Sequence, residues 1–432
     1  MKGRWQNLHR LVVTVPGRLE IRRRFGWPLW GVMSRLAWLH RLTLARRTRV
    51  VAIAGSVGKT TTMRAVAAVL GLPVHRQALL NANSYSALAG GVLRIRPWQR
   101  CAVLEVGLSS HQMSRYARVV RPDVAVMTAI ADDHRRAFSS LEARRDEKAK
   151  LVRALPLDGL AILNADDPHV RWMASVTRAR VVLVGTAPDA EVRASDVQLD
   201  WPNGMRFTLH AAGATRPVRI RLVGQHMIAP ALAAIAVGLV LGHDLDRVLG
   251  AIETLAPMPG RMMPVVLANG AVILRDDFKG TYDSFHAALD AFAAVPARRR
   301  IAVLGEMDEP PPQEAVAYRA LGARVAAMAA RAIFVGHKFR RYGPGATSGG
   351  LAADQVLRAR DVHDALALVR ADLGPGDVVL LKGRWQQRLG RIALALEGRD
   401  VRCRADPCPF RRMLCDLCPL LERPFAGYPP RA

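Results

Sequence analysis

Short runs of apolar residues recur along the chain, and most are followed by a polar group and then by helix-forming residues. The first run is Val50 to Ile53, and the helix formers Met63 to Leu70 follow it. Apolar runs of about four to eight residues bounded by turn residues predict buried strands. Strands that alternate with helical segments predict a mainly parallel sheet, so the expected fold class is α/β. The other predicted strands cover residues 102–107, 124–128, 161–164, 271–274, 301–304, 333–335 and 377–381.

A Met-Pro-Gly-Arg segment at residues 258–261 interrupts this pattern, which then starts again. The repeat predicts a phosphate-loop (P-loop) central domain and a smaller Rossmann-like C-terminal α/β domain. The apolar run from Met227 to Gly242 is shorter than the roughly 20 residues of a membrane span, so we expect a buried helix there. With a basic, aromatic-rich N-terminal arm and a Cys-rich tail added, the expected segments are 1–48, 49–252, 253–398 and 399–432.

A glycine-rich turn joins the first predicted strand to the first predicted helix. Backbone N–H groups at such a turn bind phosphate oxygens, a lysine reaches the β- and γ-phosphates, and a following hydroxyl binds Mg²⁺. Gly55 and Gly58 are three positions apart, closer than in the common phosphate loop, so the prediction depends on the strand-then-helix context. The predicted nucleotide-binding residues of this turn are Gly55, Ser56, Val57, Gly58, Lys59, Thr60 and Thr61.

Four predicted strands of the central domain end in groups suited to a magnesium nucleotide. Besides the glycine-rich turn, these groups are Glu105, His134, and the pair Asn164 and Asp167. Ligands of open α/β sheets bind at the carboxyl ends of the strands, so the four ends predict one shared site. Each group also has a plainer interpretation: a solvated loop acid, a histidine bonded to loop backbone, or a helix cap at Asp167.

Composition narrows the class of protein. Half of the residues are hydrophobic, which excludes a disordered chain, and the net charge is +27. This charge suits a nucleotide, a phosphorylated substrate, an anionic membrane or a nucleic acid, and a generally arginine-rich surface explains it equally well. Basic residues are spread along the whole chain, which makes nucleic acid the least favoured partner. Only seven of the 63 basic residues are lysines, so we expect a lysine in a motif to be there for its amine chemistry.

The N-terminal arm is strongly basic and contains Trp5, Trp27, Trp30 and Trp38. Basic and aromatic residues together predict contact with an anionic membrane surface, and a helix packed on the central domain is the alternative. The arm lacks the pattern of a secretory signal, and five cysteines with four crowded in the tail do not form a disulfide scaffold. The expected location is therefore the cytoplasm, with peripheral contact at the inner face of the membrane.

The tail cysteines have the spacing C-x4-C-x6-C-x2-C. Four thiolates can hold a tetrahedral Zn²⁺ ion, so this spacing predicts a structural zinc site. An iron–sulfur cluster and free thiols are the alternatives. The tail cysteines are Cys403, Cys408, Cys415 and Cys418, whereas Cys101 precedes a predicted strand and is expected in the core.

From about residue 49 to residue 395, the motifs and their order resemble the Mur ligase superfamily. The resemblance is greatest to its UDP-N-acetylmuramoyl-tripeptide:D-alanyl-D-alanine ligase branch. The matching motifs are G-S-V-G-K-T-T-T at 55–62, N-A-N-S at 81–84, L-E-V-G at 104–107, A-D-D-H at 131–134, N-A-D-D-P at 164–168, G-Q-H at 224–226, P-G-R at 259–261, V-L-G-E-M at 303–307 and G-D-V-V-L-L-K-G at 376–383.

The resemblance implies an ATP-dependent ligase that joins a carboxylate to an amine in cell-wall or related peptide synthesis. The carboxylate would pass through an acyl phosphate, and ADP and phosphate would be released. By this resemblance Lys59 contacts the β- and γ-phosphates, and Thr60 and Glu105 bind one Mg²⁺ ion. His134 and a carbamylated Lys148 serve a second Mg²⁺ ion.

The resemblance also implies roles for residues of both domains. A nucleotide would be bound by Asn164, Asp167, His226, Arg261 and Asp276. Candidates for binding the acceptor or the amine are Asn81, Asn83, Lys279 and Lys382.

Several positions depart from the family pattern. Met227 and Pro230 stand where asparagines are usual, which predicts looser adenine binding. Lys279 and Thr281 also replace asparagines, and Arg384 replaces a serine. Only the short arm precedes the phosphate loop, where the family has a domain for the UDP-muramoyl group. We therefore expect either that the ordinary UDP-muramoyl peptide is not the substrate or that it is bound by other means. A P-loop ATPase or kinase and a non-catalytic nucleotide-binding homologue are the alternative functions.

Overall fold

The computed structural model describes residues 30–73, 85–107, 111–132, 137–406, 408, 410 and 413–426. Two compact units make up this chain. The first unit comprises the chain up to Ser195 together with residues 208–217 and Ile228–Glu253. The second unit comprises residues 196–207, 218–227 and the chain from Thr254 onward.

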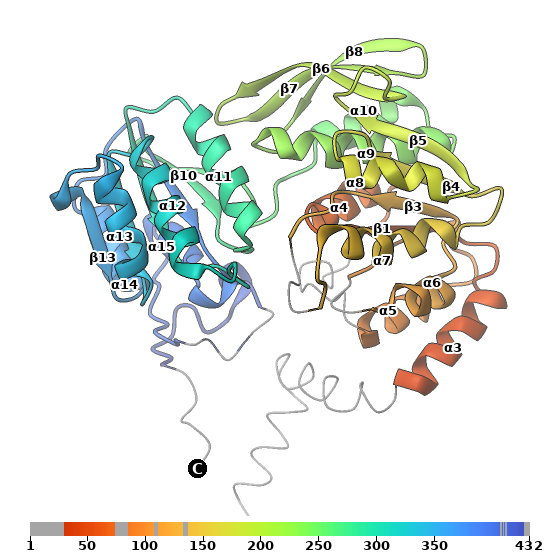
Figure 1. Cartoon of the computed structure of the whole chain (residues 1–432), viewed down its shortest axis with the longest axis horizontal. Helices are drawn as coiled ribbons and strands as arrows, with labels where there is room; N and C mark the ends of the chain where they lie inside the picture. Colours follow the sequence, from red (N-terminus) through yellow and green to blue (C-terminus); the bar gives the residue numbers. More distant parts are fainter. Residues whose placement is uncertain are drawn as a thin grey trace, which may run out of the picture. The chain divides into compact units, whose positions relative to one another are not determined.

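A mainly parallel eight-stranded sheet has its strands β1 to β5 wholly in the first unit (Figure 1). Its strands are β1 (Arg49–Ala54), β2 (Cys101–Glu105), β3 (Val124–Met127), β4 (Leu160–Asn164), β5 (Arg180–Gly185), β6 (Val192–Asp200), β7 (Gly204–Ala211) and β8 (Ala214–Ile220). The strand order is β2-β1-β3-β4-β5-β6-β7-β8, and each neighbouring pair from β2 to β6 is parallel. The carboxyl ends of β1 to β4 therefore meet at one edge of the sheet, as the sequence predicts.

Helices cover both faces of β1. They are α3 (Trp30–Leu42), α4 (Lys59–Val69), α5 (Tyr85–Val92), α6 (Met113–Val120), α7 (Leu141–Arg153), α8 (Pro168–Arg171), α9 (Ile228–Val240) and α10 (Leu245–Glu253). Val50, Ala52 and Ala54 share one hydrophobic core with residues of α5, α6 and α7. Since side chains alternate along a strand, Val51 and Ile53 point to the other face, and they are equally buried. Burial on both faces explains why the strand is an uninterrupted apolar run.

Helix α9 confirms the buried helix predicted for the long apolar run. Ten of its residues, from Ile228 to Gly238, are buried, and the helix packs against α4, α10 and β5. In the part of the chain that the structure describes, every helix is too short or too polar to cross a lipid bilayer.

The second unit contains a six-stranded sheet in the order β13-β12-β11-β14-β10-β9. Its strands are β9 (Met263–Val266), β10 (Val272–Asp276), β11 (Arg299–Leu304), β12 (Arg331–Val335), β13 (Val356–Ala359) and β14 (Asp377–Lys382). All neighbouring strands are parallel except the edge strand β9, which is antiparallel to β10. The associated helices are α11 (Tyr282–Ala294), α12 (Glu314–Ala326), α13 (Phe339–Ser348), α14 (Val362–Arg370) and α15 (Gly390–Leu396). The predicted Rossmann-like α/β fold is confirmed.

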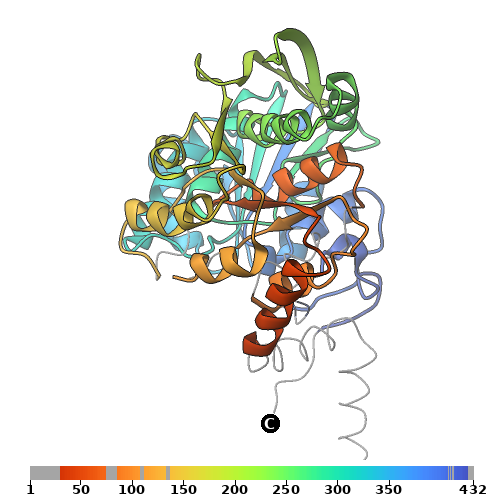
Figure 2. The ribbon, with the colours of Figure 1, turned by 90° about the vertical axis from the view of Figure 1, so that its right-hand side faces the viewer.

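The described end of the N-terminal arm is helix α3, which packs beside α5 and α6 (Figure 2). Ala37 is fully buried in this contact. The buried guanidinium of Arg41 donates hydrogen bonds to the carbonyl oxygens of Val120 and Arg121 and to the carboxylate of Asp123. The described part of the arm therefore adopts the alternative interpretation, a helix held on the main sheet domain.

Candidate functional site

The phosphate loop has a backbone that requires its two glycines. Gly55 has φ of 142° and Gly58 has φ of 82°, both in the region that side chains disfavour. A Cβ atom on Gly55 would lie 2.0 Å from the Oγ1 atom of Thr128, so only glycine fits there. Gly58 is the N-cap of α4, and a glycine cap leaves the helix N-terminus without a side chain above it. This arrangement exposes backbone N–H groups to an anion.

Lys59 lies at the first position of α4, and its ammonium group curls back over the loop. The Nζ atom donates to the carbonyl oxygens of Gly55 and Ser56, at 2.8 Å in each case. Neutral carbonyl oxygens hold the ammonium group in place while it keeps its charge. The residue predicted to contact phosphates is therefore positioned by the loop itself.

Thr60 and Glu105, the two residues predicted to bind one Mg²⁺ ion, are in direct contact. The Thr60 hydroxyl, in the first turn of α4, donates to Oε2 of Glu105 at the end of β2 at 2.8 Å. Hydroxyl and carboxylate oxygens are the hard ligands that Mg²⁺ prefers. Among the residues that the structure describes, no three His, Cys, Asp or Glu side chains are grouped to hold a metal ion. The pair therefore fits Mg²⁺ together with nucleotide phosphates and water rather than an all-protein cage.

Lys148 reaches the phosphate loop from helix α7. Its side chain is 1% exposed, and its Nζ atom donates to the Ser56 hydroxyl at 2.6 Å. The neighbouring Lys150 is 41% exposed and forms an ion pair with Glu147. The two lysines of this helix thus have different surroundings, and Lys148 is not a surface lysine. His134, Asn81 and Asn83 lie outside the described residues.

Ser56, Lys59, Thr60, Glu105 and Lys148 are referred to below as the phosphate-loop cluster. Thr128, which the sequence analysis did not select, supports this cluster by donating to the carbonyl oxygens of Val57 and Ala54, at 2.5 and 3.3 Å. It directly follows β3, so its place at a strand end is the signal that would have identified it. Arg144 was also missed: it is buried on α7 and donates to the carbonyl oxygen of Ala131 at 2.9 Å.

Asn164 and Asp167 fasten the loops that follow β3 and β4. The Asn164 amide donates to the carbonyl oxygen of Thr128 at 2.8 Å. The Asp167 carboxylate accepts from the backbone N–H groups of Ile130, His169 and Val170, and the last two lie at the start of α8. Asp167 therefore caps a helix and joins two strand ends. Its contact with a nucleotide stays a prediction.

In the second unit, Asp276 and Lys382 form a buried ion pair at the ends of β10 and β14. The Nζ atom of Lys382 is 2.5 Å from Oδ2 of Asp276, and it also donates to the carbonyl oxygen of Lys279 and the hydroxyl of Ser284. An ammonium group has three protons to donate, and these three acceptors can use all of them. Burial lowers the pKa of Lys382, and the Asp276 carboxylate opposes this effect. These four residues are referred to below as the second-unit cluster.

The other predicted residues of the second unit lie around turns. The Arg261 guanidinium stacks 5.0 Å from the ring centre of Phe278, and the backbone N–H of the next residue, Met262, donates to Asp276 at 3.2 Å. His226 stands against Gly224, where a Cβ would lie 2.7 Å from the imidazole Cε1 atom.

The structure also shows the surroundings of three positions that depart from the family pattern, Met227, Pro230 and Arg384. Met227 is buried at the end of the short 3-10 helix Gln225–Met227. In the first unit, Pro230 lies beside the phosphate loop, with its Cγ atom 3.7 Å from where a Cβ on Gly58 would stand. Arg384 pairs with Glu306 at 2.5 Å, and the backbone N–H of Glu306 donates to the side-chain oxygen of Gln387 at 2.5 Å.

The four tail cysteines line one pocket beside Arg388 and Arg391, and none of the four forms a disulfide. Cys101 begins β2, far from the tail in sequence, and also forms no disulfide. The tail pocket lies outside the strand-end clusters and is treated separately below.

Comparison with protein families gives two matches that cover most of the described chain. Residues 53–238 match the Mur ligase middle domain, and residues 260–385 match the Mur ligase glutamate ligase domain. These two ranges contain the phosphate-loop cluster and the second-unit cluster respectively.

Individual relatives agree with these matches. The UDP-N-acetylmuramoyl-tripeptide–D-alanyl-D-alanine ligase of Mycobacterium tuberculosis is 33% identical over 381 residues, which cover 82% of this chain and 73% of the relative. The UDP-N-acetylmuramate–L-alanine ligase of Xanthomonas campestris is 38% identical over 259 residues, which cover 57% of this chain and 51% of the relative.

The fold also resembles solved structures. MurF from Acinetobacter baumannii superposes with a TM-score of 0.74 at 20% identity, covering 86% of this chain and 81% of that chain. MurF ligase from Thermotoga maritima, solved in complex with ADP, gives a TM-score of 0.72 at 20% identity, covering 85% of this chain and 83% of that chain. With the sequence matches, this establishes that the chain belongs to the Mur ligase family of ATP-dependent carboxylate–amine ligases.

Proposed function

We propose that this ligase activates a peptide carboxylate with ATP and joins it to the amine of an amino acid or dipeptide. The relatives named above act on UDP-muramoyl substrates, and the M. tuberculosis relative adds D-alanyl-D-alanine. We therefore take a muramoyl-linked peptide as the first candidate acceptor and D-alanyl-D-alanine as the first candidate amine. The observation that supports the proposal best is the phosphate-loop cluster, in which residues from β2, α4 and α7 meet at one loop.

The chemistry explains why a phosphate loop serves amide formation. A carboxylate is a poor acyl donor because its leaving group would be an oxide ion. Transfer of the γ-phosphoryl group of ATP to the carboxylate oxygen gives an acyl phosphate, whose leaving group is phosphate. Attack by the amine then forms the C–N bond, and phosphate departs with the oxygen that came from the carboxylate. The protein contributes by positioning the reactants and by neutralising charge.

Within this proposal Lys59 binds the β- and γ-phosphates, and the backbone N–H groups around Gly58 donate hydrogen bonds to phosphate oxygens. Thr60 and Glu105 hold one Mg²⁺ ion, which neutralises phosphate charge when it is bound. Their direct hydrogen bond supports this role, because it brings the two oxygen atoms together. Asn164 and Asp167 hold the loops after β3 and β4 in place beside the nucleotide.

A second Mg²⁺ ion is proposed near Lys148 and His134. A lysine can become an anionic oxygen ligand if its neutral amine adds CO₂ to form a carbamate, a reaction that arginine does not undergo. Lys148 is buried beside Ser56 of the phosphate loop, where a carbamate would stand close to the phosphates.

The second unit contributes Arg261, Asp276 and His226 to nucleotide binding in this proposal. Lys382 acts as a positioning residue, because its three donors are directed at Asp276, the Lys279 carbonyl and Ser284. The side chain of Lys279 is only partly buried and remains the candidate for contact with a carboxylate or phosphate of the substrate.

The arm is proposed to bring the enzyme to the inner surface of the membrane, within the cytoplasm. Val32, Leu36 and Leu39 of α3 are each more than half exposed, at positions that share one side of a helix. Basic residues of the same helix, such as Arg35, would contact anionic headgroups. Binding to vesicles with and without anionic lipid tests this part separately from catalysis.

Phosphate release from Mg-ATP tests the ligase proposal. Purified enzyme is given pools of muramoyl-peptide acceptors together with amino acids or D-alanyl-D-alanine. Release that requires both an acceptor and an amine, and that is lost in Lys59→Ala, supports a ligase and begins to name its substrates. Release that requires neither would indicate an ATPase, and absence of both ATP binding and turnover would indicate a non-catalytic homologue.

A further inference from the structure

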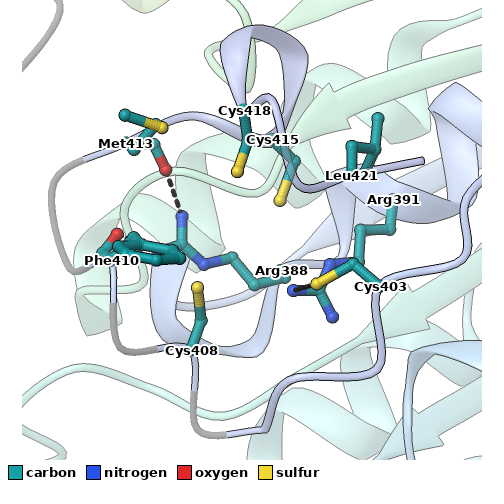
Figure 3. A pocket seen from close by; sticks show the side chains of 9 residues that line it. All are labelled: Arg388, Arg391, Cys403, Cys408, Phe410, Met413, Cys415, Cys418 and Leu421. Atoms are coloured by element: carbon teal, nitrogen blue, oxygen red, sulfur yellow. Dashed lines mark hydrogen bonds between the residues drawn. The ribbon is translucent and has the colours of Figure 1, made fainter. Parts of the chain in front are cut away.

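Four thiols from one short tail converge on a single pocket (Figure 3). The side chains of Cys403, Cys408, Cys415 and Cys418 point into it from different stretches of the tail. Cys403 and Cys415 are buried, and the other two are partly buried. Four sulfur atoms around one small space, without a disulfide between them, form the donor set of a thiophilic metal ion. In the described chain the thiols do not already stand at metal-binding positions, so an ion would draw them together.

Two buried guanidinium groups line the same pocket. Arg391 is 3% exposed and donates to the Sγ atom of Cys403 at 3.4 Å. Arg388 is 6% exposed and donates to the carbonyl oxygens of Phe410 and Met413, at 2.6 Å each. Arginine stays protonated in proteins, so these groups place two positive charges beside the four thiols. Buried charges of this kind require compensation.

Charge balance favours a cation held by four thiolates over four protonated thiols. Four thiolates around one divalent cation carry a net charge of minus two, which the two guanidinium groups match. Four protonated thiols would leave the same two positive charges facing neutral groups. A zinc ion prefers four thiolates in tetrahedral geometry and has no redox chemistry, so it suits a pocket with a structural role.

We propose that Cys403, Cys408, Cys415 and Cys418 bind one Zn²⁺ ion as a structural site that fastens the tail to the second unit. On binding, each S–H bond breaks, its proton passes to water, and a Zn–S bond forms, so that no oxidant or reductant is needed. The site takes no part in the ligase reaction and goes beyond the proposed function.

The contacts of Asp416 show what the zinc site would stabilise. Asp416 lies between two of the zinc-binding cysteines, in the 3-10 turn Cys415–Leu417, and pairs with Arg275 at 2.7 Å. Arg275 is a buried residue of β10 that also contacts Asp277 at 3.2 Å. Holding this turn in place would therefore brace the end of β10, next to Asp276 of the second-unit cluster.

Metal analysis of the full-length protein, purified without chelator, tests the proposal. We expect about one Zn²⁺ per chain. A thiol-specific mercurial added to the native protein should release zinc as four thiols react together. Replacement of zinc by Co²⁺ should give the intense thiolate-to-cobalt absorption of a tetrahedral all-sulfur site. None of these measurements depends on ligase activity.

Variants of the two partly buried cysteines locate the site. Cys408→Ser and Cys418→Ser should each lower the retained zinc at least about tenfold and weaken the cobalt absorption. Cys101→Ser is the matched control, because that cysteine belongs to β2, and it should keep the full zinc content. The mercurial titration uses the unaltered chain, so a variant that fails to fold does not remove the test.

Three results would overturn the proposal. Purified protein without zinc that also fails to bind added Zn²⁺ or Co²⁺ would show that the pocket holds free thiols. Iron with acid-labile sulfide would show a cluster, and zinc lost equally in Cys101→Ser would place the ion elsewhere. Normal ATP-dependent ligation together with any of these results would separate the failure of the zinc site from that of the proposed function.

Discussion

The phosphate-loop cluster and the second-unit cluster both lie at the carboxyl ends of parallel strands, but they hold their charged groups differently. In the first, Lys59 and Lys148 donate to neutral carbonyl and hydroxyl oxygens. In the second, Lys382 donates to the carboxylate of Asp276 and is almost completely buried. The first cluster also holds the Thr60 and Glu105 oxygens, a pair of the kind that Mg²⁺ prefers, whereas the second is an ion pair that ties two strand ends to the turn at Lys279. The comparison indicates that the first cluster suits an incoming magnesium nucleotide and that the second holds a loop in position.

Substitution of Lys148 in the phosphate-loop cluster should cause the largest loss of catalytic rate. Lys148→Ala removes the amine that would form a carbamate beside the phosphate loop, and we expect kcat to fall about 10²–10³-fold, as for other transition-state charge stabilisers. A small carboxylic acid such as acetate should restore part of the rate, because its carboxylate can take the place of the carbamate. Steady-state rates with and without acetate measure both effects.

Two control variants distinguish a lysine that forms a carbamate from a lysine that contributes only its positive charge. Lys148→Arg keeps a positive charge but cannot be carbamylated, so acetate should not rescue it. Lys150→Ala removes the exposed lysine two positions away and should leave kcat within about twofold. Full activity in Lys148→Arg would contradict the carbamate.

Lys382 provides the largest expected effect on stability. Lys382→Met leaves the Asp276 carboxylate without its buried partner, and we expect the free energy of unfolding to fall by about 3–5 kcal/mol. Adding Asp276→Asn should recover part of this loss, since the uncompensated charge is then removed. Denaturant unfolding of the single and double variants provides the measurement. A single variant as stable as the parent would show that the ion pair does not hold this loop.

Substitutions of Thr60 and Glu105 test whether the phosphate-loop cluster binds Mg²⁺. Glu105→Gln and Thr60→Ala should each raise the Mg²⁺ concentration for half-maximal rate about tenfold, because each removes or weakens one oxygen ligand. The two residues touch, so the double variant should show less than the sum of the two single effects. Titration of the ligase rate with Mg²⁺ measures this. Strict additivity would argue against a shared ion.

Substitution of Asp377, the first residue of β14, should have the smallest effect on stability. It tests the hydrogen bonds that this buried carboxylate accepts from Arg299 and from the backbone of Gly374. Burial raises the pKa of Asp377, but hydrogen bonds from Arg299 and from the backbone N–H of Gly374 outweigh it and hold the pKa below its ordinary value. This stabilisation is present above the ordinary pKa and is lost as pH falls through the lowered one.

The expected result of Asp377→Asn is a loss of about 1–3 kcal/mol of unfolding free energy at pH 7. The difference from the parent should shrink as the pH falls below about 4, where the parent carboxylate also becomes neutral. Urea unfolding between pH 7 and pH 3 measures it. A difference that grows toward acid pH would contradict the assigned direction of the pKa shift.

Local patterns were sufficient to predict strands β1 to β4, β10 to β12 and β14, and with them the strand ends that carry the first cluster. The apolar runs before Gly55 and Glu105 are strands β1 and β2, and the Thr60–Glu105 contact follows from their parallel pairing. Strands β5 to β9 and β13 were not predicted. Strand β6 alternates irregularly between buried and exposed residues and has few apolar runs, whereas β5 has an apolar run that was overlooked. Patterns of this kind reflect burial, so strands at partly exposed positions give weak signals.

Contacts between distant residues could not be predicted from the same patterns. The hydrogen bond from Lys148 to Ser56 joins residues 92 positions apart, and the Arg275–Asp416 pair joins residues 141 positions apart. Arg144 gave no signal, because in a chain with this many arginines a single buried one resembles the rest. The tail cysteines could be selected by spacing, but only the fold shows that two arginines share their pocket.

The most direct test of acyl transfer is the fate of the acceptor oxygen. An acceptor whose reacting carboxylate is labelled with ¹⁸O is incubated with Mg-ATP, the amine and enzyme, and the released phosphate is analysed by mass spectrometry. An acyl phosphate transfers one carboxylate oxygen to phosphate, so each amide formed should yield one phosphate carrying ¹⁸O. Phosphate released without label while amide accumulates would contradict activation of the carboxylate by this phosphate loop.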